Sequence, residues 1–203
     1  MFFSFDGIDG AGKTTQIELF SRWLQEHGQT TVVCRDPGST KLGEAIREIL
    51  LERHEFEISR MAEMLLYMAA RAQLVEEVIR PALAAGKTVI SDRFLLANVI
   101  YQGHAGGLDV ERLWEIGAFI TQGIEPDLTF LLDMPAASAQ QRIRRELDRM
   151  EQHGQDFRER LRAGFLVEAA RRPGQIVVID ASRPVDEVHA HVRAAAERAL
   201  NRQ

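Results

Sequence analysis

The stretch FFSFDGIDGAGKTTQ, residues 2–16, decides the fold of this chain. Within it, residues 7–14 (GIDGAGKT) match the phosphate-loop pattern GxxxxGK[ST] in full. The apolar run at residues 2–5 predicts a β-strand before the loop, and residues 13–27 predict a helix after it. This strand–loop–helix context is what a phosphate-binding P-loop requires, so the sequence predicts a P-loop nucleotide-binding protein.

The chemistry of the loop follows from its residue types. Glycines let backbone N–H groups turn toward an anion, and the helix N-terminus adds partial positive charge. We expect Lys13 to reach the β- and γ-phosphates and the Thr14 hydroxyl to ligate Mg²⁺. The alternative is a chance glycine-rich turn, and the motif does not say which reaction follows. The predicted ATP-binding residues are Gly7, Ile8, Asp9, Gly10, Ala11, Gly12, Lys13, Thr14 and Thr15.

Working outward, short apolar runs alternate with longer helical patterns. Continuous apolar strands separated by helices predict a parallel sheet that is covered on both faces, a three-layer α/β/α fold. The further strands are expected at residues 30–34, 88–90, 128–132 and 176–179. The further helices are expected at residues 42–53, 59–85, 108–122, 136–152, 157–172 and 185–201, and Pro81 is expected to kink or end the longest of them near Arg80.

The composition limits the classes of function. The chain has 203 residues, 45% of them hydrophobic, which favours a single domain with one sizeable core. A formal net charge of -5 argues against a nucleic-acid surface, so any cationic site must be local. No apolar run approaches the roughly 20 residues of a membrane span and no signal peptide is apparent, so we expect a cytoplasmic protein that does not enter a membrane. The one cysteine, Cys34, is expected to be a buried strand residue.

Candidate residues for a second substrate follow the predicted strands. Asp92 and Arg93 end the third strand, where ligands of open α/β sheets bind, so Asp92 is expected to hold Mg²⁺ or its water and Arg93 a phosphate. A salt bridge at the strand end is the alternative. Asp36 begins a Pro-Gly turn after the second strand, and a local ion pair explains it equally well.

Three residues on predicted helices are weaker candidates. Tyr67 and Arg71 lie four residues apart and therefore share a helix face, which would suit a base with a polar edge. Core packing of Tyr67 and a surface position for Arg71 are the favoured alternatives on spacing alone. Arg47 on the preceding helix is, by spacing alone, a solvated charge.

Residues 142–162 are dense in charge. Arg142, Arg145 and Arg149 recur at three- and four-residue spacing, so a helix would place them on one face. Composition alone favours a solvated, salt-bridged helix. The alternative is a set of cations that stabilises the charge of phosphoryl transfer.

The chain resembles the bacterial thymidylate kinases over nearly its whole length. The motifs that carry the resemblance are FDG with the P-loop (5–14), RDPG (35–38), LGEAIR (42–47), YMAARAQLV (67–75), DRF (92–94), YQG (101–103), PDLT (126–129) and LDRME (147–151). The resemblance implies a nucleoside monophosphate kinase with a five-stranded parallel sheet, one domain over residues 1–203 and a helical lid at about 140–156. It implies transfer of the γ-phosphoryl group of ATP-Mg²⁺ to dTMP, and a homodimer.

The resemblance also implies roles for single residues. Tyr67 would stack on thymine, Arg71 would contact the base edge, and Arg93 would lie at the acceptor phosphate. The other acceptor residues implied are Asp36, Arg47, Asn98, Tyr101 and Gln102. Asp9 places the chain with the branch that has an acidic P-loop residue near the substrate and catalytic arginines in the lid, here Arg149 before Arg142 or Arg145.

Two rival functions stay open at this point. One is a P-loop kinase acting on another nucleotide or on a nucleoside, and the other is a nucleotide-dependent switch that hydrolyses slowly. Only the kinases would release ADP in response to an acceptor.

Overall fold

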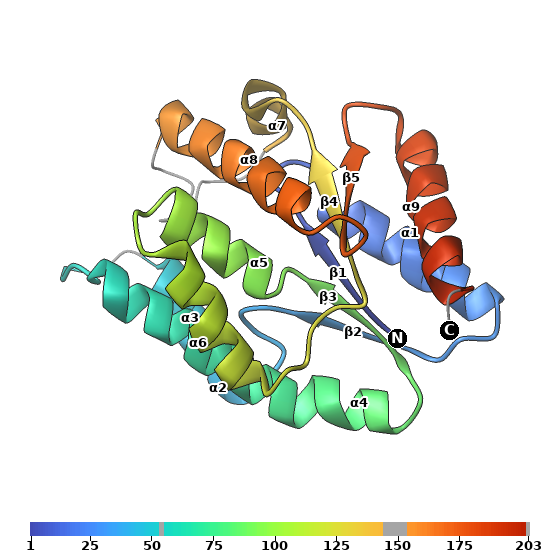
Figure 1. The fold of residues 1–203 in the computed structure, drawn as a ribbon, viewed down its shortest axis with the longest axis horizontal. Coiled ribbons are helices and arrows are strands. Elements are labelled where there is room, and N and C mark those ends of the chain that lie inside the picture. The colour runs from blue at the N-terminus through green and yellow to red at the C-terminus, as the bar shows by residue number, and fades with distance from the viewer. Residues whose placement is uncertain (53–54, 144–153, 202–203) are drawn as a thin grey trace.

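A computed structural model describes residues 1–52, 55–143 and 154–201 of the chain. A five-stranded parallel sheet in the order β2-β3-β1-β4-β5 forms its centre, as predicted (Figure 1). The strands are β1 (Phe2–Asp6), β2 (Thr31–Arg35), β3 (Thr88–Asp92), β4 (Leu128–Asp133) and β5 (Ile176–Asp180). Each strand continues one or two residues beyond its predicted end, so that a charged residue closes each strand at the carboxyl edge of the sheet.

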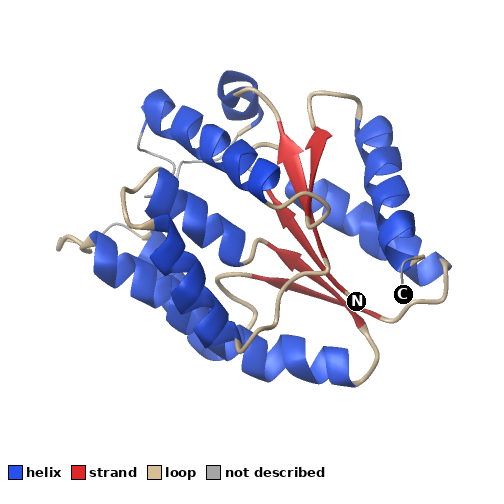
Figure 2. Cartoon of the chain, viewed as in Figure 1, coloured by secondary structure: helices blue, strands red, loops and turns tan. Residues whose placement is uncertain are grey.

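Helices cover both faces of the sheet, which explains why the strands are continuously apolar (Figure 2). One face carries α1 (Lys13–Glu26) and α9 (Val185–Leu200). The other face carries α3 (Arg60–Leu74), α5 (Leu95–Asn98), α6 (Val110–Thr121) and α8 (Gly154–Arg171). Helix α2 (Lys41–Leu51) packs on α3, and α7 (Ala136–Arg142) follows the carboxyl end of β4.

Aromatic residues fill the layer between the sheet and α1. Phe3 and Phe5 alternate along β1 and contact Phe20 of α1, with ring centroids 5.1 and 5.6 Å apart. Phe130 of β4 completes the group at 4.8 Å from Phe5. Phe2 points to the opposite face, where it meets Phe94 edge-on at 5.0 Å. These buried rings hold β1 in the middle of the sheet and place the loop that follows it at the centre of the carboxyl edge.

The longest predicted helix does not end near Arg80, which was one of the two effects expected of Pro81. The helix continues from Arg60 to Ala84, but a π-helical segment, η1 (Val75–Ile79), precedes the short α4 (Arg80–Ala84). Pro81 thus falls directly after the π-helical turn, near the start of α4, and has no N–H with which to continue the hydrogen-bond ladder. The wider turn absorbs the proline without ending the helix.

The helical segment over residues 95–104 was not predicted from the sequence. Helix α5 runs without interruption into the π-helical segment η2 (Val99–His104). Residues 94–103 are buried throughout, so the segment has no polar face and no amphipathic period to reveal it.

Other predictions can be compared with the described residues. Cys34 is buried, as expected. Of the helix predicted over residues 136–152, the described part ends at Arg142, and residues 144–153 lie outside the described part of the chain. Among the described residues, no helix combines the length and apolar character needed to cross a bilayer.

Candidate active site

A cleft with a volume of about 730 Å³ opens at the carboxyl edge of the sheet. The P-loop forms its floor, because β1 is the central strand and ends there. Its walls come from the loop after β2, from α3, from the residues after β3 and from the loop after β5. The order of the strands changes direction at β1, which is where open α/β sheets bind their ligands.

Two glycines of the P-loop occupy positions that no side chain could share. Gly7 has φ +136°, and a Cβ atom there would lie 2.5 Å from the carbonyl oxygen of Leu132. Gly10 has φ +88°, and its Cβ would lie 2.1 Å from the carbonyl oxygen of Ala139. The loop is therefore packed closely beneath β4 and α7. Among the described side chains, none caps the N-terminus of α1, so its first N–H groups face the cleft as an anion-binding end.

Lys13 lies inside this loop. Its ammonium donates to the carbonyl oxygens of Gly7 at 2.9 Å and Ile8 at 3.1 Å. Burial lowers the pKa of Lys13, and the nearby Arg93 guanidinium lowers it further, while Asp9 acts in the opposite direction. The Nζ atom is 3.6 Å from Asp9 Oδ1. A cation held by backbone carbonyls at the start of a helix is positioned to bind the terminal phosphates of a nucleotide.

Arg93 joins the P-loop to the opposite wall. It has φ +69°, and this left-handed backbone follows directly after β3. Its guanidinium donates to the Gly7 carbonyl oxygen at 3.3 Å and to the carboxylate of Asp9, and it lies over the Tyr101 ring at 5.2 Å. Burial alone would lower the pKa of Arg93, but Asp9 and neighbouring acidic groups raise it well above its ordinary value. Arg93 therefore stays charged between the two walls of the cleft.

Two carboxylates lie behind these cations. Asp6 is fully buried, and burial raises its pKa to about 6 despite the opposing effect of Arg93 and Lys13. Its Oδ2 accepts a hydrogen bond from Ser4 at 2.8 Å, while its Oδ1 has no hydrogen-bond partner among the described atoms. Asp92 Oδ1 is buried and has no hydrogen-bond partner among the described residues either. Of these two carboxylates, Asp92 lines the cleft and Asp6 does not, so a cation in the cleft can reach Asp92 but not Asp6.

A chain of buried polar groups forms the wall opposite the P-loop. Arg71 donates from Nε to Asp36 at 2.6 Å and from a terminal nitrogen to Asn98 Oδ1 at 2.9 Å. Asn98 donates to Gln102 at 2.7 Å, and Gln102 donates to Glu63 at 3.0 Å. Since a carboxylate only accepts, each amide in this chain has a single favourable orientation.

The surface position considered for Arg71 is wrong, because the residue is 1% exposed. Burial raises the pKa of Asp36, and the ion pair with Arg71 opposes that rise. Tyr67, one turn earlier on α3, is half-buried and lines the cleft. Spacing alone favoured core packing for Tyr67, and the residue does pack against the small cluster of Ile46, Leu50 and Ala70 while it also lines the cleft.

Arg47 is not simply a solvated charge. It lines the cleft and donates to the carbonyl oxygen of Pro37 at 3.1 Å. Burial lowers its pKa, and Arg35 and Arg93 lower it further. Several guanidinium groups thus repel one another across one cleft, which is the arrangement expected where an anion binds.

The far end of the cleft lies at the loop after β5. Arg142, at the end of α7, donates to the carbonyl oxygen of Ala181 at 3.2 Å. Ala181 and Arg183 of that loop line the cleft together with Arg142. Arg145 and Arg149 lie outside the described residues.

Most of the predicted site residues meet in this one cleft. Of the described ones, Gly7 and Ile8 do not line it, because the Ile8 side chain is buried in the core and Gly7 faces β4. The predicted residues that line it are Asp9, Gly10, Ala11, Gly12, Lys13, Thr14, Thr15, Asp36, Arg47, Tyr67, Arg71, Asp92, Arg93, Asn98, Tyr101, Gln102 and Arg142. Sequence reasoning did not assign a site role to Glu63, which accepts a hydrogen bond from Gln102. No local pattern identifies it, since its position depends on the packing of α3.

Comparison with known proteins identifies the family. The family profile described as Thymidylate kinase matches residues 5–192. The chain is 46% identical over 183 residues to the thymidylate kinase of Rhodopirellula baltica, covering 90% of this chain and 74% of that protein. It is 45% identical over 194 residues to that of Kosmotoga olearia, covering 95% and 93%.

A solved structure agrees. The crystal structure of thymidylate kinase from Ehrlichia chaffeensis superposes with a TM-score of 0.78 at 29% identity, and covers 97% of this chain and 98% of that one. The chain therefore belongs to the thymidylate kinase family and phosphorylates dTMP to dTDP, with ATP as the phosphoryl donor.

Proposed function

We propose that the chain is a single kinase domain in which the P-loop binds ATP and a separate set of arginine and aromatic residues binds dTMP. The observation that supports this proposal is that Arg93 contacts both the P-loop and the Tyr101 ring, so the donor and acceptor phosphates would meet beside it. In-line transfer needs no covalent intermediate, because the acceptor phosphate oxygen is already anionic. Catalysis then consists of alignment and charge stabilisation.

The acceptor would lie along the polar wall. Arg93 and Arg47 would hold its phosphate, and Tyr101 would lie beside the deoxyribose. Tyr67 would stack on thymine, a neutral ring that gains by contact with another ring. Arg71, Asn98 and Gln102 would face the polar edge of the base, and the remaining acceptor residues are Asp36 and Asp9.

Mg²⁺ is the metal that these residues would suit. Thr14 is exposed at the cleft, and Asp92 brings a buried carboxylate oxygen without a hydrogen-bond partner. Within the described residues no cluster of three His, Cys, Asp or Glu side chains forms a metal cage, and Mg²⁺ bound with nucleotide needs only one or two protein ligands and keeps several waters. When bound, Mg²⁺ supplies neutralising charge at the phosphate oxygens.

The Asp92→Asn substitution tests this site. It keeps the shape of the side chain but removes its negative charge, so the Mg²⁺ concentration for half-maximal rate is expected to rise about tenfold or more. The measurement is ADP release against free Mg²⁺ at saturating ATP and dTMP. Asp109→Asn is the matched control, because asparagine still caps α6 there. An unchanged Mg²⁺ requirement would remove Asp92 from the metal site.

Arginines of the segment 140–156 would complete the donor site, as in the branch of the family with an acidic P-loop residue. Asp9 supports this, because its carboxylate faces Lys13 and Arg93 and the P-loop itself contains no arginine. Arg149, with Arg142 or Arg145, would then stabilise charge on the transferring phosphoryl group.

The rate of ADP release tests both the reaction and the lid arginines. With the wild-type chain, dTMP is expected to stimulate release strongly over ATP alone and over a panel of other monophosphates. Arg149→Ala is expected to lower kcat about 10²-fold or more while the KM of dTMP changes little, since the contact forms in the transition state. Arg149→Lys is the conservative comparison. A loss below threefold in Arg149→Ala would exclude a catalytic role for Arg149.

A homodimer would cover apolar side chains that are exposed on α3 and α6. Phe119 of α6 is 83% exposed and Leu65 of α3 is 52% exposed, although these helices pack side by side. Exposed apolar side chains on two adjacent helices are typical of a protein interface. Phe119→Asp is therefore expected to convert dimers into monomers in sedimentation velocity, whereas Val167→Glu on α8 is expected to leave them intact. A wild-type monomer would contradict the proposal.

A further inference from the structure

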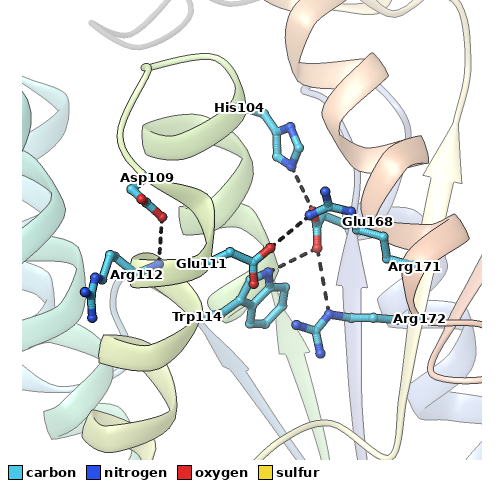
Figure 3. A network of polar contacts seen from close by, with 8 residues as sticks. All are labelled: His104, Asp109, Glu111, Arg112, Trp114, Glu168, Arg171 and Arg172. Carbon is cyan, nitrogen blue, oxygen red and sulfur yellow. Dashed lines mark hydrogen bonds and ion pairs between the residues drawn. The ribbon is translucent and has the colours of Figure 1, made fainter.

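A buried carboxylate outside the cleft holds together three helical segments (Figure 3). Glu168 of α8 is 1% exposed. One of its oxygens accepts a hydrogen bond from His104 Nε2 at 2.9 Å, and the other accepts one from Trp114 Nε1 at 3.1 Å. His104 ends η2 and Trp114 lies on α6, so Glu168 ties α8 to both.

Two arginines balance the charge of this carboxylate. Arg171 donates to Glu168 at 3.3 Å and to Glu111 of α6 at 3.2 Å. The guanidinium of Arg172 stacks on the Trp114 ring at 3.7 Å, with its Nε 3.8 Å from Glu168. Burying a charge costs free energy that such pairing largely offsets, so the network is by itself weak evidence for stability. What it fixes is the position of α8 against η2 and α6.

The geometry concerns the contact between α8 and η2. Phe157, Gly164 and Glu168 are spaced by seven and four residues, so they lie on one face of α8. The Phe157 ring meets the Tyr101 ring edge-on at 6.4 Å. A Cβ atom on Gly164 would lie 2.7 Å from the Cβ of His104, so the two segments touch closely there. These contacts fall on both sides of Gln102, the acceptor residue between Tyr101 and His104.

We propose that Glu168 is a positioning residue for the acceptor: through His104 it holds η2 so that Tyr101 and Gln102 keep their places in the dTMP site. From the other side, Gln102 is held by Glu63 and Asn98. The π-helical turn lies between these two attachments, and π-helical turns of this kind are rare and frequent at functional sites. This proposal rests on the placement of dTMP against η2 proposed above.

Steady-state kinetics of three variants test the proposal. Glu168→Gln keeps the shape and an acceptor for Trp114 but removes the charge, and His104→Ala removes the link to η2. Each is expected to raise the KM of dTMP about tenfold, while the KM of ATP stays within about twofold, because only the acceptor wall moves. The double variant is expected to show no further rise, since both changes break one connection.

A matched control separates this effect from a general loss of stability. Ile79→Ala removes a buried side chain on η1 that does not line the cleft, so it should lower the melting temperature but leave the KM of dTMP unchanged. The His104 side chain is 19% exposed, so His104→Ala carries the test even where Glu168→Gln does not fold.

The outcomes distinguish the two proposals. If Gln102→Ala raises the KM of dTMP while His104→Ala and Glu168→Gln only lower the melting temperature, the positioning role of Glu168 is overturned. If Gln102→Ala also leaves this KM unchanged, the placement of dTMP against η2 fails, and the role of Glu168 fails with it.

Discussion

Replacing Lys13 with alanine is expected to lower kcat by about 10²–10³-fold, the effect of losing one preorganised charge contact to the transition state. Lys13 is held by the carbonyl oxygens of Gly7 and Ile8, so its ammonium is in place before the phosphoryl group moves. Charge on the β- and γ-phosphate oxygens grows during transfer, and a cation fixed at the helix N-terminus needs no reorganisation to meet it.

The measurement is ADP release at saturating ATP and dTMP, with thermal unfolding recorded in parallel. Lys87→Ala removes an exposed lysine in the turn before β3 and should leave kcat unchanged. The Lys13→Ala variant is expected to fold, because alanine at this buried position leaves no charge unpaired. A turnover within about threefold of the wild type would show that Lys13 does not contact the transferring phosphoryl group.

Replacing Arg71 with methionine is expected to affect both stability and acceptor binding. Asp36 would then be a buried carboxylate without its partner, and breaking a buried pair in this way costs about 3–5 kcal/mol of the free energy of unfolding. Under the proposed placement of dTMP against Arg71, the loss of this buried, hydrogen-bonded charge should also lower kcat/KM for dTMP about 10²-fold or more.

The pH dependence of this loss has a definite sign. Burial raises the pKa of Asp36, and without Arg71 that rise loses its strongest opposing group, although Arg47 and Arg93 still oppose it. The folded variant then binds a proton that the unfolded chain releases above about pH 4, so its stability falls as the pH rises. Urea unfolding at several pH values should therefore show a smaller difference from the wild type at about pH 4 than at about pH 8.

A second substitution separates the two effects of the Arg71 change. Asp36→Asn combined with Arg71→Met removes the unpaired charge and is expected to restore much of the stability, but the KM of dTMP should stay high. If the double variant recovered both its stability and the wild-type KM of dTMP, Arg71 would contribute to folding and not to acceptor binding. An Arg71→Met protein as stable as the wild type would contradict the buried ion pair.

The phosphate loop and the sheet were predictable because their signals are local. The spacing of Gly7, Gly12 and Lys13 predicts a strand before the loop and a helix after it, and each strand was a short, mainly apolar run. Every strand extends one or two residues past its predicted end, because the last charged residues belong to the sheet and not to the loops. Asp92 and Arg93 were likewise predictable as site residues, since they end a strand of a parallel sheet.

The acceptor wall was harder to predict, and α5 with η2 was missed. A helix that is buried on every side has no apolar stripe, so residues 94–104 carry no periodic signal. Without the family resemblance, Arg71 would have been assigned to the surface. Its burial depends on a partner 35 residues away, and that distance in sequence leaves no local pattern.

The sequence by itself determined the P-loop and the parallel sheet, because each depends on residues that are neighbours along the chain, whereas the class of reaction followed from the resemblance to a known family. Only the tertiary structure decided which polar residues are buried and paired, as for Arg71 with Asp36 and for His104 with Glu168, 64 residues apart. The physical reason is that the free energy of a charge depends on its surroundings, and folding brings those surroundings together from distant segments.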